Sequence, residues 1–179
     1  MNRLAFNRGF LCGAMDRVAD GGVEWRQYIA HALADLKILW LDPCNKPIRI
    51  GTEDPENRDR RRSLKTHGDF DTVALEMRQI RTVNLRMVDI ADFIIVHIDI
   101  SVHACGTYEE VFWANRMMKP ILVHSVGGKQ NAPDYLFGTV PHQLIFSTWE
   151  EIVAYLQHVA RDEHVKDLKR WRFFNFTGE

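Results

Sequence analysis

The chain of 179 residues is 46% hydrophobic, which suits one domain with a sizeable core rather than a disordered protein. Its 23 Lys and Arg residues nearly balance 24 Asp and Glu residues, and the formal net charge of −1 disfavours a general nucleic-acid-binding protein. No apolar run approaches the ~20 residues of a membrane span, and the N-terminal residues lack the apolar core of a signal peptide.

The first 70 residues predict two strands with a helix between them. Gly9–Cys12 is a short apolar segment that stops at a glycine and predicts the first strand. Glu24–Lys37 places apolar side chains at the spacing of an amphipathic helix, and Ile38–Leu41 predicts the second strand. Residues 42–70 are rich in Pro, Asn, Asp and Arg without a sustained period, so we expect a long loop there.

The rest of the chain continues this alternation. Asp92–Ile98 is rich in β-branched residues and predicts a central strand buried on both faces. The other expected elements are a helix over 71–91 in one or two pieces, a helix over 107–118, a strand over 120–124, a loop over 125–142, a strand over 143–146 and a helix over 149–161 capped by Ser147 or Thr148. This order predicts an α/β fold with a five-stranded parallel sheet and helices on both faces. We expect one domain over residues 1–161 and a charged, aromatic tail over 162–179.

Ligands of such sheets bind beyond the carboxyl ends of the strands, so residues that follow strands are candidates for a site. The stretch His103–Glu110 (HACGTYEE) follows the predicted central strand and leads into a helix. Its glycine, Gly106, allows a tight turn and a close approach of the backbone to a ligand. The helix dipole explains acidic residues in a first helical turn. The alternative is that one glutamate acts as a nucleophile or acid–base group.

Three segments together resemble the nucleoside 2-deoxyribosyltransferases, and the phage-type members in particular. They are FLCGAMD at Phe10–Asp16, NLRMVDIADFIIVHID at Asn84–Asp99 and CGTYEEVFWA at Cys105–Ala114. The resemblance extends from residue 10 to about residue 155. It implies a flavodoxin-like, Rossmann-like doubly wound fold and transfer of a 2-deoxyribosyl group between nucleobases. Related branches of the family instead hydrolyse the N-glycosidic bond of nucleoside monophosphates.

The resemblance also implies a nucleophile. The family's catalytic glutamate lies four residues after the glycine of a G-x-x-x-E segment, with an alanine four residues later, and Gly106, Glu110 and Ala114 match this pattern. We therefore expect Glu110 to be the nucleophile and Glu109 to face solvent. A carboxylate can stabilise the positive charge that builds on the anomeric carbon and then bond to that carbon, as in retaining glycosidases.

Two positions depart from the family pattern. Where the family commonly has an aspartate that can act on the leaving base, this chain has Asn84, and Asp89, about one helical turn further on, is the candidate to compensate. The second family aspartate, two residues before the glycine, corresponds to Ala104. We expect Asp99 or His103 to take over that role.

The turn after the first strand is the expected base pocket. Gly13 and Met15 match the small-residue turn of the family, although a tight turn with a core methionine would explain the same residues. Asp16 is a further candidate for a polar contact with the sugar or base. Asp134, in the second predicted long loop, is expected to contact the sugar within one subunit or across an interface.

The run Asn57–Lys65 (NRDRRRSLK) concentrates positive charge. A solvated loop explains it, and the alternative is a clamp for a 5′-phosphate, because guanidinium groups bind phosphate through two parallel hydrogen bonds. Cys12, Cys44 and Cys105 have neither a disulfide-scaffold nor a zinc spacing, which favours a reducing cytoplasm and no metal site. The glycine-rich loops of dinucleotide and ATP enzymes are missing from the sequence, so we expect no cofactor.

Together these features predict a cytoplasmic nucleoside 2-deoxyribosyltransferase without metal or cofactor. The alternatives are a nucleoside or nucleoside 5′-monophosphate N-glycosidase on the same scaffold, with water as the acceptor, and a non-catalytic nucleotide sensor. The expected partners are a small-molecule nucleoside or nucleotide and a free nucleobase, with no membrane and no nucleic acid. The resemblance and the aromatic tail also favour a homo-oligomer.

Overall fold

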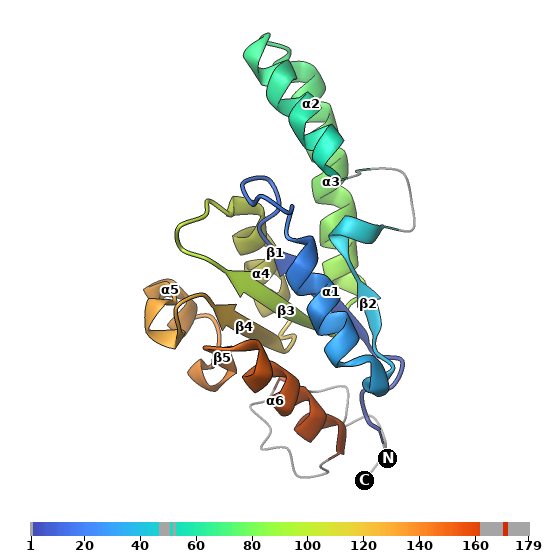
Figure 1. Cartoon of the computed structure of the whole chain (residues 1–179), viewed down its shortest axis with the longest axis vertical. Helices are drawn as coiled ribbons and strands as arrows, with labels where there is room; N and C mark the ends of the chain where they lie inside the picture. Colours follow the sequence, from blue (N-terminus) through green and yellow to red (C-terminus); the bar gives the residue numbers. More distant parts are fainter. Residues whose placement is uncertain (1, 47–50, 52, 162–169, 172–179) are drawn as a thin grey trace.

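The computed structural model describes residues 2–46, 51, 53–161 and 170–171 and is built around a sheet with helices on both faces (Figure 1). The strands are β1 (Arg8–Gly13), β2 (Leu39–Leu41), β3 (Phe93–Ile98), β4 (Ile121–Ser125) and β5 (Ile145–Phe146). The helices are α1 (Val23–Ala32), α2 (Pro55–Thr66), α3 (Phe70–Ile90), α4 (Cys105–Arg116), α5 (Asp134–Phe137) and α6 (Trp149–Arg161). Short 3-10 turns are η1 (Ala34–Leu36), η2 (Pro43–Asn45), η3 (Lys129–Asn131) and η4 (His142–Leu144).

The five strands are all parallel and follow the order β2-β1-β3-β4-β5. This is the flavodoxin-like order of a doubly wound fold. The predicted α/β architecture, with five parallel strands between two helical layers, is therefore confirmed. The chain changes its winding direction between β1 and β3, and ligands of such sheets bind beyond the carboxyl ends of the strands at that switch point.

Alternate residues of the strands point to opposite faces and bury two separate cores. On one face, α3 and α4 pack on a layer that includes Phe10 and Ile94. On the other face, α1 and α6 pack on a layer that includes Leu11 and Ile95. Because β3 lies in the middle of the sheet, both of its faces are apolar, and the prediction of a strand buried on both sides is confirmed.

The prediction of a loop over residues 42–70 is wrong, because this stretch contains helix α2. Asp54 caps the helix by accepting a hydrogen bond from the backbone N–H of Asn57 at 2.7 Å. Pro55 occupies the first turn, where its missing N–H leaves no hydrogen bond unmade. None of the residues of α2, all of which are described, is buried. The helix therefore lacks the apolar stripe from which helices are usually predicted.

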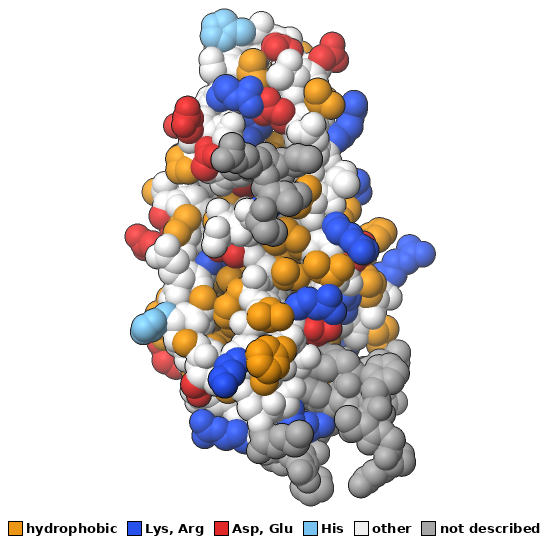
Figure 2. All heavy atoms as spheres, turned by 90° about the vertical axis from the view of Figure 1, so that its right-hand side faces the viewer, with side chains coloured by type: hydrophobic (Ala, Val, Ile, Leu, Met, Phe, Trp, Pro, Cys, Tyr) orange, Lys and Arg blue, Asp and Glu red, His pale blue; other side chains and the backbone are white. Residues whose placement is uncertain are grey.

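Helix α2 and the N-terminal half of α3 form a hairpin that extends beyond the sheet, which we call the α2–α3 arm (Figure 1). Gly68 turns the chain at the tip with φ of 79°, a left-handed conformation that glycine adopts without steric cost. Helix α3 is continuous over 21 residues, and its C-terminal half reaches the sheet through Met87 and Val88. Figure 2 shows acidic and basic side chains intermingled along the outer surface of the arm.

Other predicted boundaries differ from the structure by a few residues. The helix predicted over 24–37 ends at Ala32 and is followed by η1, and the fifth strand shrinks to two residues because η4 precedes it. The predicted loop over 125–142 contains η3 and α5. The helix predicted over 149–161 is confirmed. Thr148 caps it by accepting from the backbone N–H of Glu151 at 3.3 Å, and the Glu151 carboxylate accepts from the N–H of Ser147 at 2.7 Å.

Most of the predicted tail, residues 162–169 and 172–179, lies outside the described residues. Trp171 is buried, and its indole N–H donates to the hydroxyl of Tyr155 at 2.8 Å. Its ring packs against Phe93, so this residue belongs to the core on the α1–α6 face. None of the described helices combines the length and apolar character that a membrane span requires.

Candidate active site

A cavity of about 650 Å³ opens at the carboxyl ends of β1 and β3. The turn after β1, the α2–α3 arm and the segment that enters α4 form its walls. This is the position at which a flavodoxin-like sheet is expected to bind its ligand. The polar and charged residues that line it include Asp16, Glu53, Arg58, Arg61, Lys65, Arg81, Asn84, His103, Glu109 and Glu110.

Glu110 projects from α4 into this cavity although only 8% of its surface is exposed. The helix starts at Cys105, two residues before its predicted start, so Glu109 and Glu110 lie beyond the first turn. Favourable interaction with the helix dipole is concentrated in that first turn and does not account for these two glutamates. The position of Glu110 therefore requires another explanation, and its surroundings supply one.

Two donors hold the carboxylate of Glu110 in place. The thiol of Cys12 donates to Oε2 at 3.0 Å, and the amide nitrogen of Asn84 donates to Oε1 at 3.1 Å. Burial raises the pKa of Glu110 from 4.5 to about 7, and the hydrogen bond from Cys12 acts in the opposite direction. A fixed carboxyl group with a pKa near neutrality, in a cavity, is typical of a catalytic group.

Asn84 on α3 joins two carboxylates. Its amide nitrogen donates both to Oε1 of Glu110 and to Oε1 of Glu53, each at 3.1 Å. Because both partners are acceptors, the NH₂ group and not the carbonyl oxygen must face them. The buried Oδ1 atom is left without a hydrogen-bond partner among the described residues. Buried acceptors without a partner are uncommon in folded proteins, and this one lies beside the two carboxylates.

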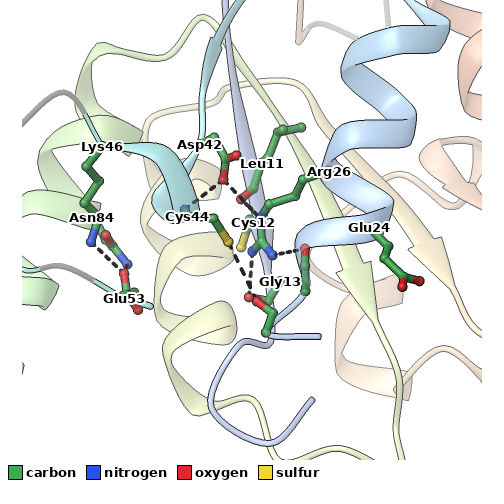
Figure 3. A network of polar contacts seen from close by, with 12 residues as sticks. Leu11, Cys12, Gly13, Glu24, Arg26, Asp42, Cys44, Lys46, Glu53 and Asn84 are labelled. Atoms are coloured by element: carbon green, nitrogen blue, oxygen red, sulfur yellow. Dashed lines mark hydrogen bonds and ion pairs between the residues drawn. The ribbon is translucent and has the colours of Figure 1, made fainter. Parts of the chain in front are cut away.

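The second carboxylate, Glu53, was missed by the sequence analysis. It lies just before α2, and its Oε1 atom forms an ion pair with Nζ of Lys46 at 2.6 Å. The side chain of Lys46 is only 2% exposed and also donates to the carbonyl of Gly51 at 2.6 Å. Figure 3 shows Lys46, Glu53 and Asn84 as neighbours. No motif in the sequence pointed to Glu53, which joins the site through its contacts with Lys46 and Asn84.

Arg26 fixes the turn after β1 that forms one wall of the cavity (Figure 3). Its guanidinium donates to the carbonyls of Leu11 at 3.3 Å, Gly13 at 3.0 Å and Gly22 at 2.6 Å. It also lies 3.6 Å from Oδ1 of Asp42, which follows β2. One buried side chain thus ties the end of β1 to the start of α1 and to the end of β2. The sequence analysis did not single out this arginine.

The structure brings several other predicted residues to the cavity. They are Gly13, Met15, Asp16, His103 and Gly106. His103 is exposed at the mouth of the cavity, in the segment that connects β3 to α4. The Gly106 backbone has no neighbouring atom within 4 Å of the place where a Cβ would be, so the space above it is open. The two turns that follow β1 and β3 therefore face the same cavity, as the sequence analysis expected.

Three predicted residues do not reach the cavity. Asp89 accepts a hydrogen bond from the indole N–H of Trp113 at 2.7 Å, on the outer side of α3 and α4. Asp99 accepts from the backbone N–H of Ser101 at 2.8 Å and stabilises the turn after β3. Asp134 is exposed at the start of α5. Asp89 and Asp99 are thus held by local contacts away from Glu110.

Positive side chains of α2 line the cavity. Arg58, Arg61 and Lys65 are spaced three and four residues apart, so they share one face of the helix. Arg58 also donates to the carbonyl of Val18 at 3.0 Å, which connects α2 to the turn after β1. Arg60, from the same charged run, does not line this cavity and pairs instead with a glutamate on α3.

Glu109 differs from its neighbour Glu110. Its side chain is 40% exposed at the rim of the cavity, where Arg81 forms a two-pronged ion pair with it, one contact being 2.8 Å. Glu109 is thus engaged by a cation, whereas Glu110 is held by two neutral donors. Within the described part of the chain, no group of three or more potential metal ligands is found.

Comparison with known proteins bears on the fold. No family model matches the chain, and no curated protein matches it in sequence. Among solved structures it is similar to a 2-deoxyribosyltransferase from Leishmania mexicana, with 18% identity and a TM-score of 0.52 over 85% of this chain and 98% of that one. A CMP N-glycosidase from Clostridium botulinum aligns with 15% identity and a TM-score of 0.48 over 86% and 99% of the two chains. The chain therefore shares the fold of the Leishmania enzyme.

Proposed function

We propose that this protein cleaves the N-glycosidic bond of a nucleoside or nucleotide and transfers the 2-deoxyribosyl group to another nucleobase. The observation that carries the proposal is the buried carboxylate of Glu110, held by two donors inside a cavity at the switch point of the sheet. The sequence resemblance to deoxyribosyltransferases and the fold shared with one such enzyme support it.

In the proposed reaction, an oxygen of the Glu110 carboxylate attacks the anomeric carbon while the bond from that carbon to the base nitrogen breaks. The bonding electrons leave with the base, which takes up a proton. A second base then attacks the sugar ester from the vacated face, so the configuration is retained overall. Because burial raises the pKa of Glu110, its anion is more basic and more nucleophilic than an exposed carboxylate.

The groups beside Glu110 suit a sugar. Glu53 is paired with Lys46 and presents a carboxylate that can accept hydrogen bonds from hydroxyl groups. His103, exposed at the mouth, is our candidate for the group that delivers a proton to the leaving base. In this proposal, the amide of Asn84 orients the nucleophile.

The positive face of α2 favours a second candidate, a reaction on nucleoside 5′-monophosphates with water as the acceptor. Arg61 and Lys65 line the same cavity as Glu110, and guanidinium and ammonium groups are the usual partners of phosphate. The same glycosyl ester on Glu110 would then be hydrolysed. The two reactions share their first step and differ in what attacks the ester.

One assay distinguishes these possibilities. The protein is incubated with a 2-deoxynucleoside, or its 5′-monophosphate, together with a different free base, and the products are separated by chromatography. A new nucleoside supports transfer, whereas free base and sugar formed at a rate independent of the acceptor support hydrolysis. Binding of nucleotide without turnover would refute both and support the sensor. Glu110→Gln is expected to abolish a covalent sugar adduct detected by mass spectrometry, with Glu109→Gln as the matched control.

Three variants of α2 test whether a substrate phosphate binds in the cavity. Arg61→Ala and Lys65→Ala remove charges that line the cavity, whereas Arg60→Ala removes one on the same helix that does not. If phosphate binds here, the first two variants raise KM for the monophosphate by about tenfold each, the effect of losing roughly 1.4 kcal/mol of binding energy, and leave the nucleoside unaffected. Equal effects of all three variants would argue against a phosphate site.

Self-association is also part of the proposal. Aromatic side chains of α4 and α5 are exposed side by side, since the rings of Phe112 and Tyr135 lie 5.5 Å apart and are 39% and 75% exposed. Exposed apolar clusters of this kind mark interaction surfaces. Light scattering on the purified protein tests for an oligomer, and a monomer at all concentrations would refute it.

A further inference from the structure

Cys12 on β1 touches the nucleophile, and nothing in the proposed reaction so far uses it. Its side chain is fully buried, and Sγ lies 3.0 Å from Oε2 of Glu110. The same sulfur lies 3.6 Å from the backbone carbonyl of Thr107, one turn earlier on α4. The thiol proton therefore has two acceptors within reach, a carboxylate oxygen and a peptide oxygen.

The thiol must be the donor in this contact. Burial, and next the charge of Glu110, raise the pKa of Cys12 well above its usual value, so the sulfur keeps its proton. An ionised carboxylate can only accept. The other oxygen of Glu110 is engaged by Asn84, and the charged groups that act on the carboxylate from neighbouring elements are Glu53 before α2 and Arg26 on α1.

We propose that Cys12 is a positioning residue that holds Oε2 of the Glu110 nucleophile and releases it when the glycosyl ester forms. The inference rests on the proposed function. Attack forms the bond from a Glu110 oxygen to the anomeric carbon and breaks the bond to the base, while the thiol proton stays on sulfur throughout. The ester oxygens carry no full charge and are poorer acceptors, so the S–H bond can turn to the carbonyl of Thr107.

A weak donor suits this position better than a strong one. A hydrogen bond that stabilises the carboxylate more than the ester raises the barrier to attack, because only interactions that strengthen in the transition state accelerate a step. A hydroxyl donates more strongly than a thiol and would hold the anion back. A residue without a donor would leave Oε2 unpaired and the carboxylate still harder to ionise.

The test compares Cys12→Ala and Cys12→Ser in the pH dependence of kcat/KM for the 2-deoxynucleoside and free base that the wild type accepts best. The acid limb reports the ionisation of Glu110 in the free enzyme. We expect its midpoint to rise by about half a pH unit in Cys12→Ala and to fall by a similar amount in Cys12→Ser. At pH 9, where Glu110 is ionised in every variant, we expect Cys12→Ser to be roughly threefold slower in the chemical step than wild type.

Cys44→Ala is the matched control, because it removes a thiol that donates to the carbonyl of Gly21 at 3.7 Å and should leave the acid limb in place. The same ionisation is followed without substrate by measuring the free energy of unfolding against pH. If this stability curve shifts in opposite directions in Cys12→Ala and Cys12→Ser, the hydrogen bond from Cys12 to Glu110 is supported. If at the same time no nucleoside or nucleotide is turned over, only the proposed function fails. Acid limbs or stability curves that coincide in wild type, Cys12→Ala and Cys12→Ser overturn the proposal.

Discussion

Replacing Glu110 by glutamine should stabilise the protein at alkaline pH even as it removes the proposed nucleophile. The pKa of Glu110 is about 7 in the folded protein and 4.5 in an ordinary environment, so between these values the folded state binds more protons than the unfolded state. Stability then falls as pH rises through this window, is constant above it, and is fully retained below pH 4.5. The two pKa values correspond to a loss of about 3 kcal/mol.

Glutamine has the shape of glutamate and cannot ionise, so Glu110→Gln escapes this loss. The free energy of unfolding is measured by urea titration at several values between pH 4.5 and 8.5 for both proteins. From pH 4.5 to 8.5 we expect the free energy of unfolding of the variant to rise by about 3 kcal/mol relative to that of wild type. Half of this rise should be reached between pH 5 and 7.

The variant must be compared with wild type, because the ionisation of His97 changes stability with pH in the opposite direction to that of Glu110. Burial, followed by the nearby His124, lowers the pKa of His97 from 6.5 to about 4, so its contribution to stability is present above pH 6.5 and disappears as pH falls towards 4. In the wild-type curve the two effects largely cancel. Glu109→Gln, at an exposed ion pair, controls for loss of a carboxylate. If the difference in free energy of unfolding between Glu110→Gln and wild type stays constant with pH, the raised pKa of Glu110 is refuted. The argument that Glu110 is tuned for catalysis then fails as well.

Three further predictions follow from the same contacts. Asn84→Asp should move the acid limb of the pH–rate profile to higher pH, because it places a third carboxylate about 3.1 Å from two others. Adding Glu53→Gln to this variant should return the acid limb to its wild-type position. Arg26→Met should lower the free energy of unfolding by about 3 kcal/mol in urea titrations, because it leaves three carbonyls without their donor. His97→Asn should become more stable relative to wild type as pH falls from 6.5 to 4, because the raised pKa of Glu110 is then no longer offset; thermal unfolding measures it.

The sheet could be predicted from the sequence because its strands carry their own signal. Phe93–Ile98 is apolar on both faces apart from His97 near its end, which is typical of a strand at the centre of a parallel sheet. Helix α2 could not be predicted in this way, because it is stabilised by the Asp54 cap, by Pro55 in its first turn and by charged contacts. Asp54 and Pro55 are signals of a helix start in the sequence, but without an apolar period they did not lead to the prediction of a helix.

The candidate site shows the same division. The choice of Glu110 rested on the resemblance to deoxyribosyltransferases, whose G-x-x-x-E segment Gly106 and Glu110 match, and the structure places Glu110 in the cavity. The aspartates proposed as partners, Asp89 and Asp99, were chosen by distance along the chain, and local hydrogen bonds hold both elsewhere. Glu53 lies 57 residues before Glu110 in the sequence, and the two carboxylates meet at one amide only in the folded protein.

An amide at position 84 suits the presence of Glu53 beside Glu110. With an aspartate at position 84, three carboxylates would face one another around the same point, and they could not all be ionised near neutral pH. An amide at that point instead donates to both glutamates and keeps them close without repulsion. The chain thus places a second carboxylate beside Glu110, with Glu53 contributed by the residues before α2 and the bridging donor by α3. In the proposed reaction, a substrate whose hydroxyl group donates to Glu53 would lie directly beside the carboxylate of Glu110.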